Sequence, residues 1–314
     1  EAEGQIWYNS TSGSFKSVVV GEAWSSTALF STSRGGGAGS GDTTSSIIFG
    51  GESSGPTLRA ETEEYNGSGW STGGNLSLSG YQLGAFGTGT ATLAGTRYRN
   101  SPSIPVATEE YDGSTWTSGG NVNTARFGGG GFGILTAGVL FGGSGSAPGS
   151  PLLSSSELYN GTAWTSGNSL NTARRGTQGF GTQTAGVAVG GGYPVPGPIG
   201  ASTEEFDGTS YTSVNSFTTN RAFFGATGIQ TDGLIAGGDT SPGYSAVTEK
   251  YDGTNWTTSP ATLATAKQTS QSSKSSSTDS MVVCFNSPSV TSEEYNRSIF
   301  VTTPAAWASG GNVN

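Results

Sequence analysis

A phrase built around a pair of aromatic residues recurs six times along the chain, and this repetition limits the fold more than any other feature. The clearest copy reads EEYDGSTW and spans residues 109–116. The first aromatic residues of the copies are Tyr65, Tyr111, Tyr159, Phe206, Tyr251 and Tyr295. The second aromatic residues are Trp70, Trp116, Trp164, Tyr211 and Trp256, and the degraded sixth copy ends at Phe300. Successive copies lie 44 to 48 residues apart, and a period of this length is typical of the blades of a β-propeller.

Each copy predicts a short β-hairpin with one aromatic residue on each arm. In the second copy the turn is Asp112-Gly113, a dipeptide that favours a tight hairpin because both residues tolerate positive φ. The acidic residues and the tyrosine form the arm before the turn, and the tryptophan lies on the return arm. The repeat therefore predicts an architecture and says little about chemistry.

Four strand-like runs make up each repeat unit. In the third unit, a glycine-rich run over 125–135 is followed by an apolar run over 137–143, a loop over 144–153 and then the hairpin. Short runs at regular spacing between turn residues are typical of all-β proteins. We therefore expect an all-β propeller of six four-stranded blades, with seven blades as the alternative. The expected propeller occupies 28–314, in units of approximately 28–74, 75–120, 121–168, 169–215, 216–259 and 260–314.

The segment before the propeller, residues 1–27, predicts a separate hairpin. Residues 4–16 read GQIWYNSTSGSFK, which is an apolar arm, a polar glycine turn and a second apolar arm. This phrase resembles a hairpin of bacteriophage tail-fibre proteins, where it joins the fibre shaft to distal domains. The resemblance implies an attachment segment and, in a fibre, a homotrimer. The alternative is that one of the two terminal segments closes the ring.

The order of motifs within the units resembles that of the kelch repeat. An apolar run that ends in Gly-Gly and is followed by the Tyr and Trp of the hairpin is the pattern that builds one kelch blade. The resemblance covers roughly residues 28–309. The phrases NTAR at 123–126 and TAGVA at 184–188 are similar to the kelch-like repeats of marine phage structural proteins. These resemblances imply a protein of the virion surface, outside the cell.

The composition argues against several classes of function. The chain has no histidine, which removes the commonest general base and the commonest ligand for Zn, Cu and Fe, so we expect no enzymatic activity, no metal and no cofactor. The net charge is −9, and no basic stripe suits a nucleic acid. No apolar run approaches the roughly 20 residues that span a bilayer, so we expect no membrane insertion. Cys284 lies in an apolar run and is expected to be a buried thiol.

The repeated acidic pairs could act as the two carboxylates of a glycosidase, but a structural interpretation is stronger. Neighbouring strand residues point to opposite faces, so the two acids of one pair do not converge. A basic residue also recurs in the first run of the units, as Arg126, Arg174, Arg221 and Lys267. We therefore predict that a repeat glutamate pairs with a repeat arginine.

Other catalytic patterns are incomplete in this sequence. The phrase YDGSTW resembles the sialidase Asp-box but lacks one residue between Asp and Gly, and no arginine triad accompanies it. Propellers similar to galactose oxidase hold copper with His and Tyr, and histidine is absent. The glycine runs at 128–131 and 190–192 lack the Lys of a phosphate loop. We expect these glycines to let inner strands crowd near the axis.

The loops between the second and third runs vary most, at 52–60, 96–106, 144–154, 192–201 and 239–246. Loops on a rigid scaffold commonly carry recognition, and exposed Tyr and Arg are favoured contact residues. The candidate binding residues are Arg97, Tyr98, Arg99, Tyr193 and Tyr244. The alternative is that these tyrosines pack against their own loops.

These observations favour a non-enzymatic virion protein, similar to a phage tail fibre, that binds a host-surface glycan or another virion protein. A lectin-like or scaffolding propeller outside any virus is the first alternative. A glycan-active enzyme that uses only carboxylates is the second.

Overall fold

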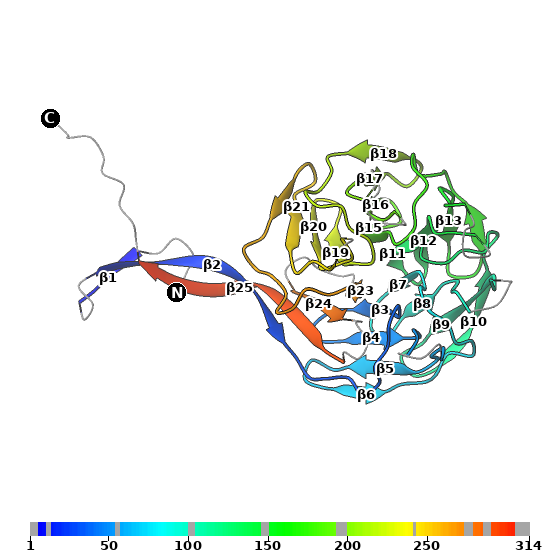
Figure 1. Ribbon diagram of the computed structural model, residues 1–314, viewed down its shortest axis with the longest axis horizontal. Helices are drawn as coiled ribbons and strands as arrows, with labels where there is room; N and C mark the ends of the chain where they lie inside the picture. The colour runs from blue at the N-terminus through cyan, green and yellow to red at the C-terminus, as the bar shows by residue number, and fades with distance from the viewer. Residues whose placement is uncertain are drawn as a thin grey trace.

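A computed structural model describes residues 6–10, 14–53, 57–99, 104–145, 151–192, 200–240, 243–272, 279–284 and 290–304. Within these ranges the chain is all-β, with 25 strands and no helix. The strands form a ring of radially arranged sheets around a central axis, and a two-stranded ribbon projects from it (Figure 1). The expectation of an all-β propeller ring is confirmed.

Five four-stranded blades make up most of the described ring, and each is antiparallel. The first holds β3 (Ala38–Gly41), β4 (Ser46–Phe49), β5 (Thr62–Tyr65) and β6 (Trp70–Thr72). The second holds β7 (Ala85–Gly87), β8 (Thr92–Ala94), β9 (Ala107–Tyr111) and β10 (Trp116–Asn121). The third holds β11 (Gly130–Ile134), β12 (Ala137–Phe141), β13 (Ser156–Tyr159) and β14 (Trp164–Ser166). The fourth holds β15 (Gln178–Thr182), β16 (Ala185–Val189), β17 (Thr203–Phe206) and β18 (Tyr211–Val214). The fifth holds β19 (Gly225–Ile229), β20 (Asp232–Ala236), β21 (Thr248–Tyr251) and β22 (Trp256–Thr258).

The remaining sheet departs from the expectation of six four-stranded blades. It has five strands in the order β1-β2-β25-β24-β23. Their bounds are β1 (Ile6–Asn9), β2 (Ser14–Ser26), β23 (Thr269–Ser272), β24 (Asp279–Cys284) and β25 (Ser292–Pro304). The strand β23 contacts β19 on one side and β3 on the other, so this sheet lies between the fifth and first blades. The side chain of Cys284 is outside the described part, so its expected burial remains a prediction.

The long strands β2 and β25 explain why the sixth repeat unit does not build its own hairpin. In the five regular blades the two aromatic residues of the repeat face each other across a turn, as Tyr111 faces Trp116. In the remaining sheet Tyr295 instead faces Trp24 of β2, with ring centroids 5.1 Å apart. The expected hairpin arm at Phe300 is therefore replaced by a strand from the N-terminal segment, and β25 continues beyond the ring in the ribbon.

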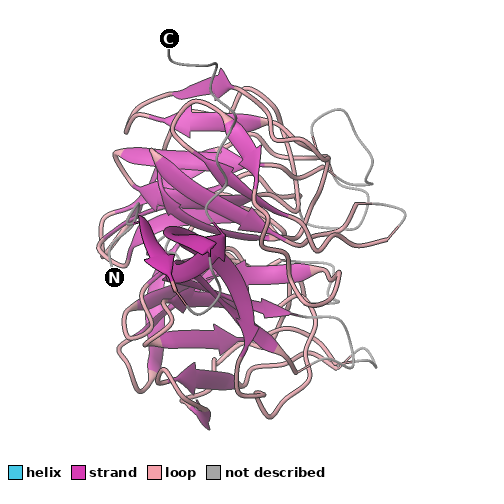
Figure 2. Ribbon diagram, turned by 90° about the vertical axis from the view of Figure 1, so that its left-hand side faces the viewer, coloured by secondary structure: helices cyan, strands magenta, loops and turns pink. Residues whose placement is uncertain are grey.

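The hydrophobic core lies between neighbouring blades. One cluster joins Ile47 and Phe49 of the first blade to Leu83 and Tyr111 of the second, all of them buried. Close approach between blades depends on glycine, because a Cβ on Gly138 would lie 2.0 Å from the ring of Phe86 in the preceding blade. The sheets therefore pack face to face around the axis, as the side view shows (Figure 2).

Candidate functional site

The first glutamate of the repeat is buried and pairs with an arginine of the same blade. In a typical pair, Nη2 of Arg126 lies 2.9 Å from Oε1 of Glu157, and both side chains are 2% exposed. The pairs are Arg34–Glu63, Arg97–Glu109, Arg126–Glu157, Arg174–Glu204 and Arg221–Glu249. The predicted pairing of repeat glutamates with repeat arginines is confirmed for Arg126, Arg174 and Arg221.

Each of these carboxylates also fixes the connection that enters its blade. Glu157 accepts hydrogen bonds from the backbone N–H groups of Asn123, at 2.6 Å, and Thr124, at 3.0 Å. Burial by itself raises the pKa of Glu63, but hydrogen bonds from Ser31 and the charge of Arg34 outweigh burial and hold that pKa below its usual value. The first glutamates are thus acceptors of structural hydrogen bonds.

The second blade reaches the same arrangement with the arginine in a different position. Gly80 stands where the third blade has Arg126, and Arg97 stands where that blade has Gly143. The Nη1 of Arg97 donates to Glu109 at 2.9 Å. A Cβ on Gly80 would lie 2.6 Å from Cγ of Arg97, so the arginine fills the space left by the glycine.

This exchange places Arg97, one of the predicted loop contacts, inside the second blade. Its side chain is 0% exposed, because it supplies the buried positive charge that position 80 lacks. Comparing the units by position would have revealed the exchange, since the second unit lacks both the repeat arginine and the Gly-Gly step.

The second glutamate of the repeat joins neighbouring blades. Its carboxylate accepts a hydrogen bond from the tyrosine hydroxyl of the following blade. The pairs are Tyr111–Glu64, Tyr159–Glu110, Tyr251–Glu205 and Tyr65–Glu294. Burial and the adjacent carboxylate raise the pKa of these tyrosines, that of Tyr159 to about 12. The pair Tyr65–Glu294 joins the five-stranded sheet to the first blade.

Two boundaries between blades depart from this Tyr–Glu pairing. Where the glutamate becomes Leu158, the tyrosine of the next blade becomes Phe206, and the two side chains pack together. Where it becomes Lys250, the ammonium pairs with Glu22 of β2. Burial, and then the charge of Glu22, raises the pKa of Tyr295. The first glutamate of each acidic pair therefore stabilises its own blade, and the second glutamate connects neighbouring blades.

The two ends of the ring differ in their connections. Because the strands of a blade are antiparallel, the loops between second and third strands lie at the same end of the ring as the connections between blades. We call this end the loop face. The tight turns lie at the other end, the turn face. The Gly-Gly step begins the loop between second and third strands in the first, third, fourth and fifth blades, at 50–51, 142–143, 190–191 and 237–238. Gly142 and Gly143 have φ of 63° and 96°, and the N–H of Gly143 donates to the carbonyl oxygen of Arg174 in the next blade.

Five backbone segments at the loop face form a chain of hydrogen bonds around the axis. The N–H of Gln82 donates to Gly36, that of Gly128 to Gln82, that of Gly176 to Gly128 and that of Phe223 to Gly176, at 2.6 to 2.9 Å. We call these five residues the axial ring. All have positive φ, between 52° and 69°. Glycine adopts this conformation freely, whereas Gln82 and Phe223 adopt it against a steric penalty.

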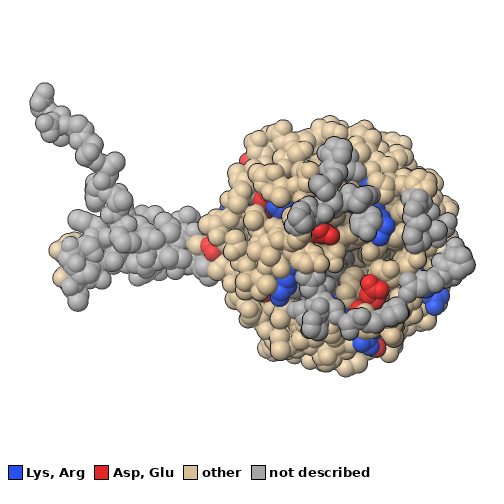
Figure 3. All heavy atoms as spheres, in the orientation of Figure 1, with Lys and Arg blue, Asp and Glu red and all other residues tan. Residues whose placement is uncertain are grey.

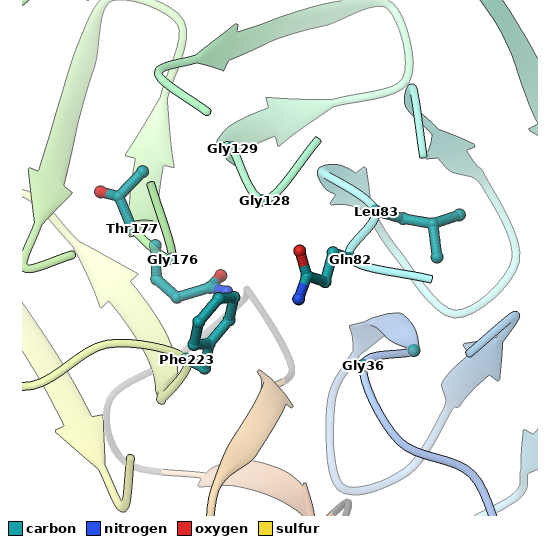
Figure 4. Close-up of a pocket in the computed structure, with 10 residues that line it drawn as sticks. Gly36, Gln82, Leu83, Gly128, Gly129, Gly176, Thr177 and Phe223 are labelled. Atoms are coloured by element: carbon teal, nitrogen blue, oxygen red, sulfur yellow. The ribbon is translucent and has the colours of Figure 1, made fainter. Parts of the chain in front are cut away.

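The axial ring surrounds a pocket with about 260 Å³ of free space, which includes the open solvent at its mouth. The side chains of Gln82 and Phe223 point toward one another across it, and Gly36, Gly128 and Gly176 leave the rest of its rim open (Figure 4). Thr177 also lines the pocket. Among the described residues that line it, none is acidic or basic. The pocket is thus lined by two amide side chains, Gln82 and Gln178, an aromatic ring and backbone groups.

A row of stacked side chains borders this pocket on the loop face. Tyr81 meets Tyr98 edge to face, with centroids 5.3 Å apart, and Tyr98 meets Phe127 at 5.0 Å. The guanidinium carbon of Arg175 lies 4.4 Å from the centre of the Phe127 ring. The Nη2 of Arg175 then donates to Oε1 of Gln82 at 2.8 Å. We call Tyr81, Tyr98, Phe127 and Arg175 the stacked row.

The remaining predicted contact residues fall in different places. Tyr98 belongs to the stacked row and is half-buried, and Arg99 follows it and is also half-buried. Tyr244 is 47% exposed on the loop of the fifth blade. Tyr193 lies outside the described residues. The aromatic and arginine residues of the repeat, by contrast, are buried or half-buried within the ring.

Sequence reasoning missed Tyr81, Gln82, Arg175 and Phe223. Gln82 and Phe223 lie two residues after the repeat arginine position, where the first, third and fourth units carry glycine. Tyr81 and Arg175 lie one residue after that position, where the units share no common residue. A non-glycine residue at the glycine position was the signal that could have identified Gln82 and Phe223, whereas no repeat signal marks Tyr81 and Arg175.

Charged side chains of both signs lie near the middle of the visible face, and uncharged residues cover most of the rest (Figure 3). No group of three or more His, Cys, Asp or Glu that could hold a metal ion occurs in the described residues. The same part of the chain contains no helix with the length and apolar character needed to cross a membrane. Comparison of the sequence with protein-family models and with curated proteins gave no match.

Proposed function

We propose that this protein is a non-enzymatic adhesion protein of a virion, similar to a phage tail-fibre domain, that binds a host-surface glycan with its loop face. The observation that carries the proposal is the stacked row beside the axial pocket. The half-buried rings of Tyr81 and Tyr98, together with the amide and guanidinium groups beside them, suit the faces and hydroxyls of sugars. The viral setting is supported by the tail-fibre-like phrase at 4–16 and the phage-like repeat phrases.

The same proposal includes a six-bladed kelch-like ring, in which the five-stranded sheet is the sixth blade. Two contacts support this count. Trp24 faces Tyr295 as the repeat tryptophans face their tyrosines, and its Nε1 donates to Thr248 of the fifth blade at 2.8 Å. Trp256 likewise donates to Thr203 of the preceding blade, at 3.0 Å. The N-terminal strand thus takes the place of a fourth strand.

Binding rather than hydrolysis is favoured by the state of the repeated carboxylates. The first glutamates are held by arginine and backbone N–H groups, and most of the second glutamates accept tyrosine hydroxyls. A glycosidase needs two free carboxyl groups that flank a bound sugar. The lining of the axial pocket consists of uncharged residues.

The test is binding of fluorescently labelled protein to a panel of bacterial cells before and after removal of surface polysaccharide. We expect saturable binding that is lost on removal, and at least tenfold weaker binding by the variant Tyr98→Ser. The control is Ile229→Ser, which changes an exposed side chain at the turn-face end of β19 and leaves binding unchanged. Binding that survives removal of polysaccharide contradicts a glycan receptor, and equal losses in both variants contradict the loop face.

A further inference from the structure

The axial ring contains a conflict between backbone and side chain at two positions. Its hydrogen bonds demand positive φ at every member, and glycine meets this demand at 36, 128 and 176. Gln82 and Phe223 have φ of 55° and 52°, a conformation that bulky residues rarely adopt. Strained positions of this kind cluster at binding and catalytic sites. The backbone ring therefore explains the conformation but leaves unexplained why these two residues are not glycine.

These side chains add little to the hydrophobic cores between the blades. Phe223 forms a cluster with Ala222 alone, separate from the large cores between the blades. Its ring lies against the backbone of Gly176, where a Cβ would be 3.1 Å from the ring carbons. The ring therefore lines the wall of the axial pocket while remaining outside the blade cores.

The amide of Gln82 has a fixed orientation. Arginine only donates hydrogen bonds, so the atom that meets Arg175 at 2.8 Å is the oxygen Oε1. The Nε2 is consequently the atom that faces the pocket and Phe223 (Figure 4). It presents two N–H groups to whatever enters, and its orientation does not depend on how the amide is assigned.

On the basis of the proposed function, we propose that Gln82 and Phe223 form a subsite for one uncharged sugar ring at the end of a glycan. The aromatic face of Phe223 packs against the C–H face of the ring, and Nε2 of Gln82 donates to a ring or hydroxyl oxygen. The free space of about 260 Å³ between these groups includes open solvent, so the subsite takes one ring and not several. The uncharged lining favours a neutral sugar.

The test is saturation-transfer NMR with the methyl pyranosides of glucose, galactose, mannose and N-acetylglucosamine. We expect transfer to at least one pyranoside from the wild-type protein and an at least fivefold weaker signal from Gln82→Gly and Phe223→Gly. Both variants suit the positive φ, so thermal melting checks that they remain folded. Gln82→Glu keeps the contact with Arg175 but removes the donors, and it is expected to lose the signal as well. Ile229→Ser keeps it.

Two results overturn the subsite: no transfer from the wild-type protein to any of the pyranosides, or full transfer from both glycine variants. Cell binding separates this failure from failure of the proposed function. Wild-type protein that binds cells but no pyranoside refutes the subsite alone. Transfer that the variants lose, together with no binding to any cell of the panel, supports the subsite and contradicts adhesion to bacterial surfaces.

Discussion

The exchanged arginine of the second blade gives the sharpest test of how the repeat is held together. Arg97→Ala leaves the carboxylate of Glu109 buried, with the backbone N–H groups of Ser77 and Leu78 as its remaining donors at 2.7 and 3.3 Å. Removing one partner of a buried ion pair costs about 3–5 kcal/mol. With an unfolding entropy of roughly 2.1 cal/mol/K per residue over 314 residues, Tm falls by about 5–8 °C.

An arginine at position 80 is expected to rescue the Arg97→Ala variant. Gly80→Arg alone is expected to destabilise, because its Cβ would lie 2.6 Å from Cγ of Arg97 and two guanidinium groups would compete for one carboxylate. In combination with Arg97→Ala it restores the arrangement of the other blades. Recovery is partial, since the new Cβ also lies 2.8 Å from the carbonyl oxygen of Tyr98. We expect the double variant to melt at least about 3 °C above Arg97→Ala, equivalent to roughly 2 kcal/mol.

Thermal unfolding followed by circular dichroism measures all three variants. The control is Arg59→Ala, which breaks an ion pair of 3.1 Å with Glu61 whose side chains are 26% and 39% exposed. An exposed pair is worth about 0–1 kcal/mol, so Tm is expected to change by less than about 2 °C. A double variant no more stable than Arg97→Ala would refute the idea that the two positions supply the same charge.

Three further predictions concern the boundaries between blades. Leu158→Glu is expected to lower the free energy of unfolding in urea by about 1–3 kcal/mol, and the added substitution Phe206→Tyr is expected to restore at least about 1 kcal/mol. Effects of the two substitutions that simply add would contradict the paired exchange. The raised pKa values of these tyrosines mean that the folded state favours the protonated hydroxyl. The contribution of each tyrosine to stability is therefore complete below the unfolded pKa near 10, and for Tyr159 it is lost as the pH rises toward about 12. Unfolding curves between pH 9 and 12 should therefore show stability that falls above about pH 10, with a smaller fall in Tyr159→Phe; equal slopes would contradict this assignment. Trp24→Ala should lower stability by about 2–4 kcal/mol, because it removes the stack on Tyr295 and the hydrogen bond to Thr248, and an unchanged Tm would argue against ring closure by β2.

Local features of the repeat were readable from the sequence because their physics is local. The dipeptide Asp112-Gly113 predicted a turn, and the carboxylate of Asp112 accepts hydrogen bonds from the N–H groups of Ser114 and Thr115 within it. These bonds hold the pKa of Asp112 at about 2. The regular spacing then predicted the ring, since each hairpin needs a neighbour on which to bury its aromatic residues.

Features that depend on distant contacts were not readable in the same way. Phe300 follows Tyr295 at the repeat distance, yet the partner of Tyr295 is Trp24, which is 271 positions earlier in the sequence. Strand pairing across the ends of a chain leaves no periodic signal. The positive φ of Gln82 and Phe223 also has no local cause, because glutamine and phenylalanine avoid it; only the hydrogen bonds of the axial ring impose it.

The most direct test of the account is a hydrogen-exchange footprint of the protein with polysaccharide released from cells that it binds. The account predicts slower exchange of backbone amides at the loop face, in the segments that contain Gln82, Tyr98, Gly128 and Phe223, with no change in the turns at the other end. Protection confined to the turn face, or the same exchange with and without polysaccharide, would contradict binding of a surface glycan at the axial pocket.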